Sequence, residues 1–260
     1  TGGSSVFNMG DQAVVAGFGS YGTFYLNAFT AESAMKMVAA AKLRRAQEAI
    51  TRMRPYAEKL QAVLSNVSDS LDAGEGVFSE KREVKHVLYV AITSNRGLCG
   101  GFNNNIIKAV RKGMQQTDAT CHVLPLGKKA NDAFEKNPNL APVGFEEDAW
   151  QIFDELNFDR AQTIAEAIMA QFEGGQYDEV KIVYNRFVNA AVQDATVENY
   201  LPLEPSEEET GPSTDTDYIF EPSQEEIIER IIPNSLKVQL YKGLLDSHAS
   251  EHGARMTAMH

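Results

Sequence analysis

The sequence is short of cysteine, of positive charge and of long apolar runs. Its two cysteines, Cys99 and Cys121, are too few for a disulfide scaffold and suit a reducing compartment. Lys and Arg total 24 against 36 Asp and Glu, and the net charge of -12 argues against nucleic-acid binding, because such a chain repels phosphates. No uncharged apolar run approaches the roughly 20 residues that cross a bilayer, so we do not expect an integral membrane protein.

Charge is also scarce at the N-terminal end. Between Thr1 and Thr30 the only charged side chain is Asp11, whereas six glycines occur there. Glycine at this density costs backbone entropy in a helix or strand, and the aromatic residues around it follow no period of 2 or 3.6. We therefore expect residues 1–33 to form an irregular segment.

Residues 34–76 have a different pattern, typical of a coiled-coil helix. Apolar residues recur there at alternating spacings of four and three, which is the a/d seam of a heptad repeat. Such a seam needs a partner helix along its length. Pro55 is expected to kink the helix near Met53 and Arg54, because proline removes a backbone donor. The seam consists of Ala39, Leu43, Ala46, Ile50, Met53, Ala57, Leu60, Leu64, Val67 and Leu71.

The polar face of this predicted helix is basic. Seven Lys and Arg stand against three Glu, in a chain whose overall charge is negative. Two interpretations remain open: a solvated helix face, or a docking stripe for an acidic surface. The basic residues are Lys36, Lys42, Arg44, Arg45, Arg52, Arg54 and Lys59, and the acidic ones are Glu32, Glu48 and Glu58.

Residues 77–203 are predicted to form an α/β domain. Short apolar runs rich in β-branched and aromatic residues alternate with segments of helical spacing, which indicates a partly parallel sheet with helices on its faces. The expected strands are 87–92, 121–126, 179–184 and 187–201, and the expected helices are 104–114, the segment from 127 to about 135, and 159–172.

The last part of the chain begins with an acidic loop and ends with a helix. Residues 204–222 are predicted to be a surface loop with a short strand possible at 218–220. Residues 223–260 are predicted to be a helix, capped by Ser223 and Glu226 and interrupted by Pro233. Small residues dominate 246–260, so this stretch is the natural partner for the alanine-rich start of the first helix. The α/β domain is therefore inserted between two long helices that pair.

The glycine-rich segment after the first strand offers little chemistry. Gly97, Gly100 and Gly101 lack the Gly-Lys-Ser/Thr ending of a phosphate loop and the spacing of a dinucleotide fingerprint. Cys99, near Arg96 at a helix N-terminus, is a candidate for a lowered pKa, but no histidine is recognisable as its base. A tight turn that positions backbone against a neighbour is the simpler interpretation.

A metal site is suggested by His248-Ala-Ser-Glu-His252. The pattern matches the H-x-x-E-H of inverted zinc peptidases, and on a helix both histidines share one face. No third protein ligand is obvious, and the small residues around it suit helix pairing better than an open catalytic site. An α/β hydrolase or zinc metalloenzyme using His248, Glu251 and His252 remains the alternative function, which the metal content of the pure chain would test.

Three segments, in order, carry a family resemblance over about residues 33–260. Thr93-Ser-Asn-Arg-Gly-Leu-Cys-Gly-Gly-Phe-Asn103 resembles the signature of the gamma subunit of F-type ATP synthase, the central rotor shaft. The segments from Ala34 to Gln47 and from Ser250 to Met259 resemble the N- and C-terminal helices of that family. The signature turn includes Arg96, Gly97, Cys99, Gly100, Gly101 and Phe102.

The resemblance implies a mechanical role without catalysis, metal or cofactor on this chain. It implies an antiparallel two-helix coiled coil with an inserted α/β (Rossmann-like) domain. The implied partners are the alpha and beta subunits around the coiled coil, and the epsilon subunit and the c-subunit ring beside the α/β domain. Met35 and Lys36 on the first helix, and Glu251 and Arg255 on the last, match positions where the family's shaft meets an acidic loop of beta.

The resemblance also points to departures and to a location. A glycine-rich segment stands ahead of Ala34 where the family has a charged helix, and the family continues beyond His260 with its second signature, so we expect an atypical N-terminus, a truncated C-terminus and weak coupling of rotation. Asn95 stands where the family usually has Asp. The expected location is the cytoplasmic face of a bacterial plasma membrane, as a peripheral subunit.

Overall fold

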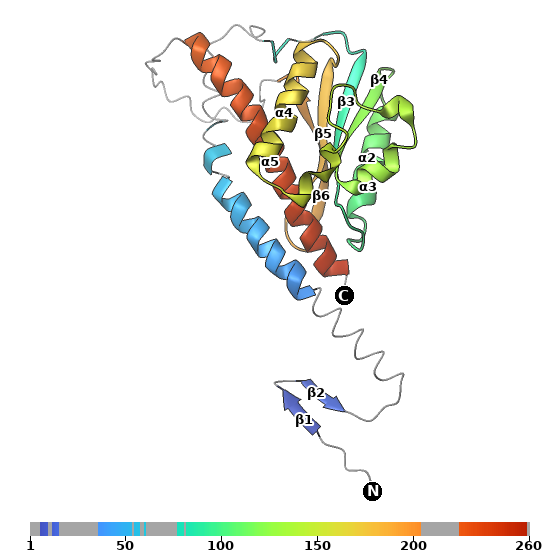
Figure 1. Ribbon diagram of the computed structural model, residues 1–260, viewed down its shortest axis with the longest axis vertical. Coiled ribbons are helices and arrows are strands. Elements are labelled where there is room, and N and C mark those ends of the chain that lie inside the picture. The colour runs from blue at the N-terminus through green and yellow to red at the C-terminus, as the bar shows by residue number, and fades with distance from the viewer. Residues whose placement is uncertain are drawn as a thin grey trace.

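The computed structural model describes residues 6–9, 12–15, 36–53, 55–57, 60, 77–80, 82–203 and 224–258. Within them a sheet of four strands is covered by helices on both faces, and a further helix lies beside the longest of these (Figure 1). None of the described helices combines the length and the apolarity that a membrane span requires.

The sheet has the order β4-β3-β5-β6. Its central strand β3 (His86–Ile92) runs parallel to β4 (Thr120–Leu126) and to β5 (Glu179–Phe187), and β6 (Gln193–Leu201) is antiparallel to β5. Residues 87–92 are all buried, because a central parallel strand is covered on both faces and therefore reads as an unbroken apolar run. The predicted, partly parallel sheet is confirmed, but the turn expected at 185–186 is wrong, because β5 continues to Phe187 and β6 begins at Gln193.

One face of the sheet is covered by α2 (Phe102–Gln115) and α3 (Lys128–Phe134). Alternate side chains of β3 point to this face, since successive residues of a strand point to opposite sides. The core here comprises Val87, Tyr89, Ala91, Ile106, Val110, Val123, Ala130, Phe134 and Val183.

The opposite face is covered by α4 (Phe158–Glu173) and α5 (Gln224–Ala258), with the 3-10 helices η1 (Pro138–Leu140) and η2 (Ala149–Asp154) between α3 and α4 in the chain. The α4 N-terminus is capped by Asn157, whose Oδ1 accepts a hydrogen bond of 2.9 Å from the Arg160 backbone N–H. From β3 this core takes Leu88, Val90 and Ile92, and from α5 it takes Leu236, Leu240 and Leu244.

The expected interruption of the last helix at Pro233 is wrong. Pro233 lies inside α5, which runs through 35 residues. A proline costs a helix about 3 kcal/mol, but the turns that follow it are buried against the sheet: Leu236 and Leu240 are fully buried. The Tyr200 hydroxyl of β6 also donates a hydrogen bond of 2.8 Å to the Leu236 carbonyl. Packing on the sheet offsets the local penalty, so the helix continues.

The N-terminal helix, residues 36–53 and 55–57, lies beside α5 and runs in the opposite direction (Figure 1). Its residues Ala39, Leu43, Ala46 and Ile50 are all buried. Leu43, Ala46 and Ile50 share a cluster with Leu245 and Ala249 of α5. The small side chains Ala46 and Ala249 allow the two helices to approach each other closely.

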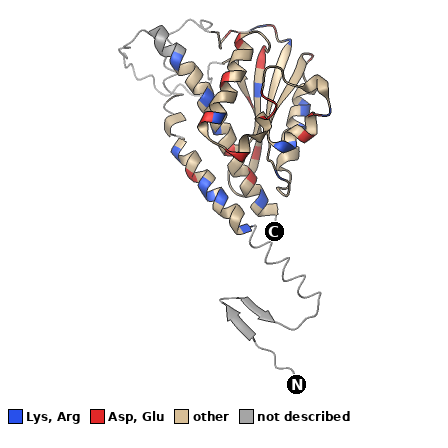
Figure 2. Cartoon of the chain, in the orientation of Figure 1, with Lys and Arg blue, Asp and Glu red and all other residues tan. Residues whose placement is uncertain are grey.

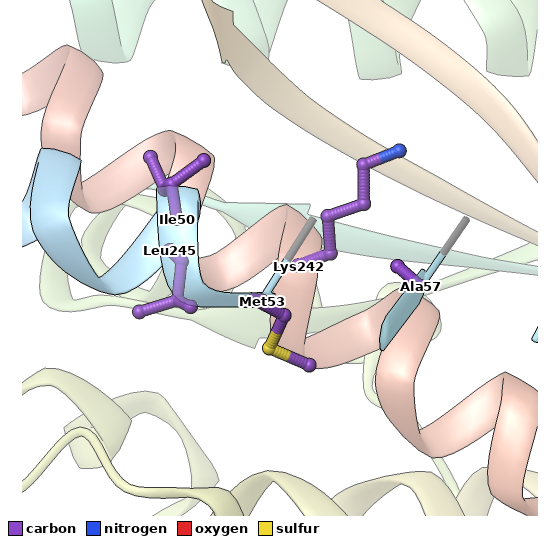
Figure 3. A pocket seen from close by; sticks show the side chains of 5 residues that line it. All are labelled: Ile50, Met53, Ala57, Lys242 and Leu245. Carbon is purple, nitrogen blue, oxygen red and sulfur yellow. The ribbon is translucent and has the colours of Figure 1, made fainter. Parts of the chain in front are cut away.

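A small apolar pocket opens between the two helices beyond this contact. Figure 3 shows its lining, which is Ile50, Met53, Ala57, Lys242 and Leu245, with the Lys242 amine pointing away from the Met53 sulfur. The lysine stem thus covers apolar surface while its charge faces elsewhere.

The irregular structure expected for residues 1–33 is also wrong in part. Two antiparallel strands, β1 (Val6–Met9) and β2 (Gln12–Val15), pair there, with Val6 opposite Val15. The missed signal is the dipeptide Gly10-Asp11 between the two runs, since Gly-Asp is a typical two-residue hairpin connection.

Several other expectations lie outside the described residues. They are the acidic loop 204–222 with its possible strand at 218–220, the seam residues Leu64, Val67 and Leu71, the expected kink at Arg54, and the contact residue Met35.

Candidate functional site

The turn after β3 is anchored to the neighbouring strand and helix. The Thr93 backbone N–H donates a hydrogen bond of 2.8 Å to the Leu126 carbonyl of β4, and the Thr93 hydroxyl oxygen accepts one of 2.8 Å from the Ala130 N–H of α3. Beyond this anchor the backbone enters the left-handed region at Leu98 (φ 60°) and Gly100 (φ 57°). The reversal leaves the Leu98 side chain 73% exposed.

Ser94 and Asn103 close the turn from inside. The Asn103 side-chain oxygen accepts a hydrogen bond of 2.9 Å from the Ser94 N–H, and its amide group lies 3.2 Å from the Cys99 sulfur. Ser94 in turn donates a hydrogen bond of 2.6 Å from its hydroxyl to the Arg96 carbonyl. These bonds hold the loop in one conformation and turn Cys99 inward.

Cys99 is a packing residue in this conformation. Its side chain is buried in a small cluster with Phe102 and with Ala254 of α5. Burial raises the pKa of the Cys99 thiol, and the opposing effects of Ser94 and Arg255 are smaller. The lowered pKa suggested by the helix N-terminus is therefore wrong, because desolvation outweighs the neighbouring positive charge.

Asn95 joins the turn to two other segments. Its side-chain nitrogen donates a hydrogen bond of 2.8 Å to the Asp154 carboxylate in η2, and its side-chain oxygen accepts one of 3.1 Å from the Lys128 backbone N–H at the start of α3. An amide serves both contacts because it carries a donor and an acceptor, whereas an ionised carboxylate carries acceptors alone.

The end of α5 docks onto this turn. The Arg255 guanidinium donates a hydrogen bond of 2.6 Å to the Gly97 carbonyl, and it forms an ion pair with Glu251, one helical turn earlier. The Arg255 and Glu251 side chains are only 14% and 10% exposed. A charge-assisted hydrogen bond in such surroundings is stronger than a neutral one, so it fixes the distance between α5 and the turn.

Asn185, which the sequence did not single out, links the same segments through β5. Its side-chain nitrogen donates a hydrogen bond of 3.2 Å to the Phe102 carbonyl, and its backbone carbonyl accepts one of 3.0 Å from the Ser250 hydroxyl of α5. Asn185 and Ser250 are both buried. The predicted strand ends at 184 and the next begins at 187, so Asn185 falls in the expected turn between them, whereas β5 continues to Phe187.

The predicted site residues therefore fall into two groups. The signature turn and the pair Glu251 and Arg255 come together in one junction, in which Gly100 faces Ala258 of α5. Lys36 lies at the start of the described part of the N-terminal helix, and Met35 is outside the described residues.

The histidines of the alternative function are next to this junction. The Nε2 atoms of His248 and His252 lie 3.3 Å apart, and the two residues form, with Glu251, the one group of possible metal ligands found among the described residues. Burial lowers the pKa of His248, and burial, together with the His248, Lys42 and Arg255 charges, lowers that of His252 to about 3. Both rings are therefore neutral at pH 7.

The sequence comparisons point to one family. The model of a family described as ATP synthase matches residues 31–260. The ATP synthase gamma chain of Flavobacterium psychrophilum is 51% identical over 230 residues, covering 88% of this chain and 78% of that relative. The gamma chain of Cytophaga hutchinsonii is 44% identical over 235 residues, with 87% and 78% covered.

A solved structure agrees with them. The central stalk with c-ring of the Tetrahymena thermophila mitochondrial ATP synthase includes a chain that matches with a TM-score of 0.63 and 26% identity, covering 88% of this chain and 97% of its own length. These findings do not support a hydrolase or zinc enzyme. They confirm the resemblance drawn from three sequence segments: the chain belongs to the ATP synthase gamma chain family.

Proposed function

We propose that this chain is the central-stalk, or rotor, subunit of an F1Fo ATP synthase. In this role it carries no catalytic group of its own. It couples proton flow through the membrane sector to ATP synthesis on the alpha/beta ring, because its surface contacts the conformations of the catalytic subunits unequally as it turns.

The observation that carries this proposal is the double packing of α5. Its residues Leu236, Leu240 and Leu244 belong to the core beneath the sheet, and Leu245 and Ala249 belong to the contact with the N-terminal helix. One continuous helix therefore joins the α/β domain to the helix pair. A force applied to the domain reaches the helix pair without crossing a flexible linker, as a rotor requires.

The helix pair is proposed to be an antiparallel two-helix coiled coil. Support comes from the buried positions 39, 43, 46 and 50, which keep the four-three spacing, and from the opposite directions of the two helices in Figure 1. The proposed organisation is an N-terminal segment 1–33, a coiled-coil helix 34–76, an α/β domain 77–203, an acidic connection 204–222 and a second coiled-coil helix 223–260. The inner part of α5 also belongs to the domain core.

The proposed partners are alpha, beta and epsilon subunits and a ring of c subunits. Figure 2 shows Lys and Arg along the N-terminal helix, where Lys42, Arg44, Arg45 and Arg52 are exposed and Lys36 is half-buried. An acidic surface of beta would fit this stripe. Met35, Lys36, Glu251 and Arg255 are proposed to mark the contact, with the Glu251–Arg255 pair holding the end of α5 in place for it.

The proposed location follows from these partners. A subunit held by a c-subunit ring is peripheral to the membrane, and the bacterial relatives favour the cytoplasmic side of a plasma membrane.

Reconstitution tests the proposal. The chain is mixed with alpha and beta subunits of a related bacterium, and complex formation and ATP hydrolysis are measured. We expect one copy of the chain to co-elute with three alpha and three beta subunits. The variant Arg44→Glu/Arg45→Glu should weaken assembly, whereas Lys108→Glu/Lys112→Glu, on the exposed surface of α2, should not. A chain that elutes alone, at every concentration tested, would contradict the proposal.

A further inference from the structure

Three metal-binding side chains gather on one face of α5, near its C-terminal end. His248, Glu251 and His252 stand at positions i, i+3 and i+4, which lie next to each other on a helix surface. One donor atom from each can be chosen so that all three lie within 4.8 Å of one another. In the proposed rotor role, Glu251 acts by pairing with Arg255. That role gives no function to the imidazole of His248 or of His252.

The two histidine nitrogens already have the separation that a metal ion needs. Zn–N bonds of about 2.0–2.1 Å at a tetrahedral angle place two nitrogens about 3.3–3.4 Å apart. The Nε2 atoms of His248 and His252 are 3.3 Å apart and share a hydrogen bond, which a metal ion would replace. Their Nδ1 atoms are buried and have no hydrogen-bond partner among the described residues, so no hydrogen bond at Nδ1 opposes a small rotation of either ring.

Glu251 would supply the third ligand and the negative charge. Its Oε1 is paired with Arg255, whereas its Oε2 lies 4.0 Å from the His248 Nδ1, beyond hydrogen-bond distance. The His248 side chain is 28% exposed, which opens the cluster to solvent on one side. An ion can enter there, and a water molecule can complete the coordination. The charges of Lys42 and Arg255 oppose the ion, so the affinity is expected to be moderate.

We propose that His248, His252 and Glu251 bind one divalent transition-metal ion of the zinc class, as a structural site without catalytic activity. Two histidines and one carboxylate are a common ligand set for zinc. The Phe153 ring of η2 stacks on His248 at 5.8 Å between centroids. A bound ion would therefore stiffen the end of α5, at the place where it meets both η2 and the turn after β3.

Calorimetric titration of ZnCl2 into the chelator-treated full chain tests this proposal. We expect saturable binding of one ion per chain. The variant His248→Gln/His252→Gln should lower the affinity at least about tenfold. The matched control is His86→Gln/His122→Gln, which removes another partly buried histidine pair, with rings 6.3 Å apart, and should leave the affinity unchanged. Circular dichroism checks that each variant is folded.

A second measurement does not depend on the variants. Co2+ bound to the wild-type chain should give the intense visible absorption of a tetrahedral site, and Zn2+ should displace it. A weak, six-coordinate spectrum, the absence of saturable binding to the wild type, or undiminished affinity in His248→Gln/His252→Gln would overturn the proposal.

Discussion

The Arg255 guanidinium donates a hydrogen bond of 2.6 Å to the carbonyl oxygen of Gly97, although 158 positions separate the two residues in the chain. The contact joins two of the three segments that resemble the gamma subunit family. It also explains why the loop after β3 needs a defined backbone: the carbonyl of Gly97 must face α5, and the left-handed residues Leu98 and Gly100 turn the chain so that it does.

Replacing Arg255 should destabilise the fold strongly. In Arg255→Ala, Gly97 loses its donor and Glu251, with a side chain only 10% exposed, keeps a charge without its partner. Breaking a buried pair in this way costs about 3 kcal/mol. Urea unfolding, monitored by circular dichroism, measures this loss. We expect a lower urea concentration at the midpoint and an unchanged slope of the free energy of unfolding against urea concentration.

The control for Arg255→Ala is a variant that breaks an ion pair at the surface, between Arg186 and Asp194. Arg186 and Asp194 are bonded at 3.1 Å, with side chains 59% and 55% exposed. Because water screens such a pair, Arg186→Ala should cost less than about 1 kcal/mol. Equal losses in the two variants would mean that the junction at Gly97 adds no stability.

Local sequence patterns could predict the elements of this fold. The run from Val87 to Ile92 has the length and composition of a buried strand, and it is one. The spacing of Ala39, Leu43 and Ala46 follows the turn of a helix, and these residues are buried as expected. In each case the pattern repeats within a few residues: the strand is apolar throughout because both of its faces are covered, and the helix is apolar on the one face that packs against α5.

Contacts between distant segments could not be predicted in this way. Nothing near Pro233 indicates that the following turns are buried by the sheet strongly enough to continue the helix. No periodicity links Arg255 to Gly97, and the resemblance to the family assigned Arg255 to a partner contact. Asn185 falls in the expected turn between two predicted strands, and its two partners come from the distant segments α2 and α5.

Two glycines of α5 should respond in opposite directions to alanine. A Cβ on Gly253 would lie 2.9 Å from the Ala190 carbonyl oxygen and 3.1 Å from its Cα, which are backbone atoms that cannot rotate away. Gly253→Ala should therefore push α5 from the β5–β6 connection and cost about 1–3 kcal/mol.

A Cβ on Gly243 would meet Ile92 and Tyr184 at 3.8 Å, which is ordinary van der Waals contact. Alanine is a better helix former than glycine by up to about 1 kcal/mol, so Gly243→Ala should be neutral or stabilising. Thermal unfolding of both variants gives the comparison. A lower midpoint for Gly243→Ala than for Gly253→Ala would contradict the close approach of α5 at Ala190.

Replacing the side-chain amide of Asn95 by a carboxylate should destabilise the fold, because the amide donates a hydrogen bond to Asp154. In Asn95→Asp the donor to Asp154 is lost, and two carboxylates face each other at a distance where the amide now bonds at 2.8 Å. We expect a loss of about 1 kcal/mol at pH 7. Because the groups are exposed, added salt should reduce the loss.

The compensating variant is Asn95→Asp/Asp154→Asn. It exchanges donor and acceptor, while the new carboxylate at position 95 can still accept the hydrogen bond that the Lys128 backbone N–H now donates to Asn95. Denaturant unfolding should show most of the stability restored. A double variant no more stable than Asn95→Asp would mean that the hydrogen bond to Asp154 contributes nothing.

Cys99 should react slowly with thiol reagents in the native chain. Burial raises the pKa of its thiol, and the side chain is 2% exposed, so reaction requires both opening of the turn and deprotonation. At pH 7.5 we expect Ellman's reagent to modify Cys99 at least about a hundredfold more slowly than in urea. Cys121 is less buried, and the variant Cys121→Ser separates the two signals.

Since Arg255 and the Gly97 carbonyl hold the turn closed, Arg255→Ala should speed the reaction of Cys99. Rapid modification of native Cys99, or a rate that Arg255→Ala leaves unchanged, would show that the turn is not held by the end of α5.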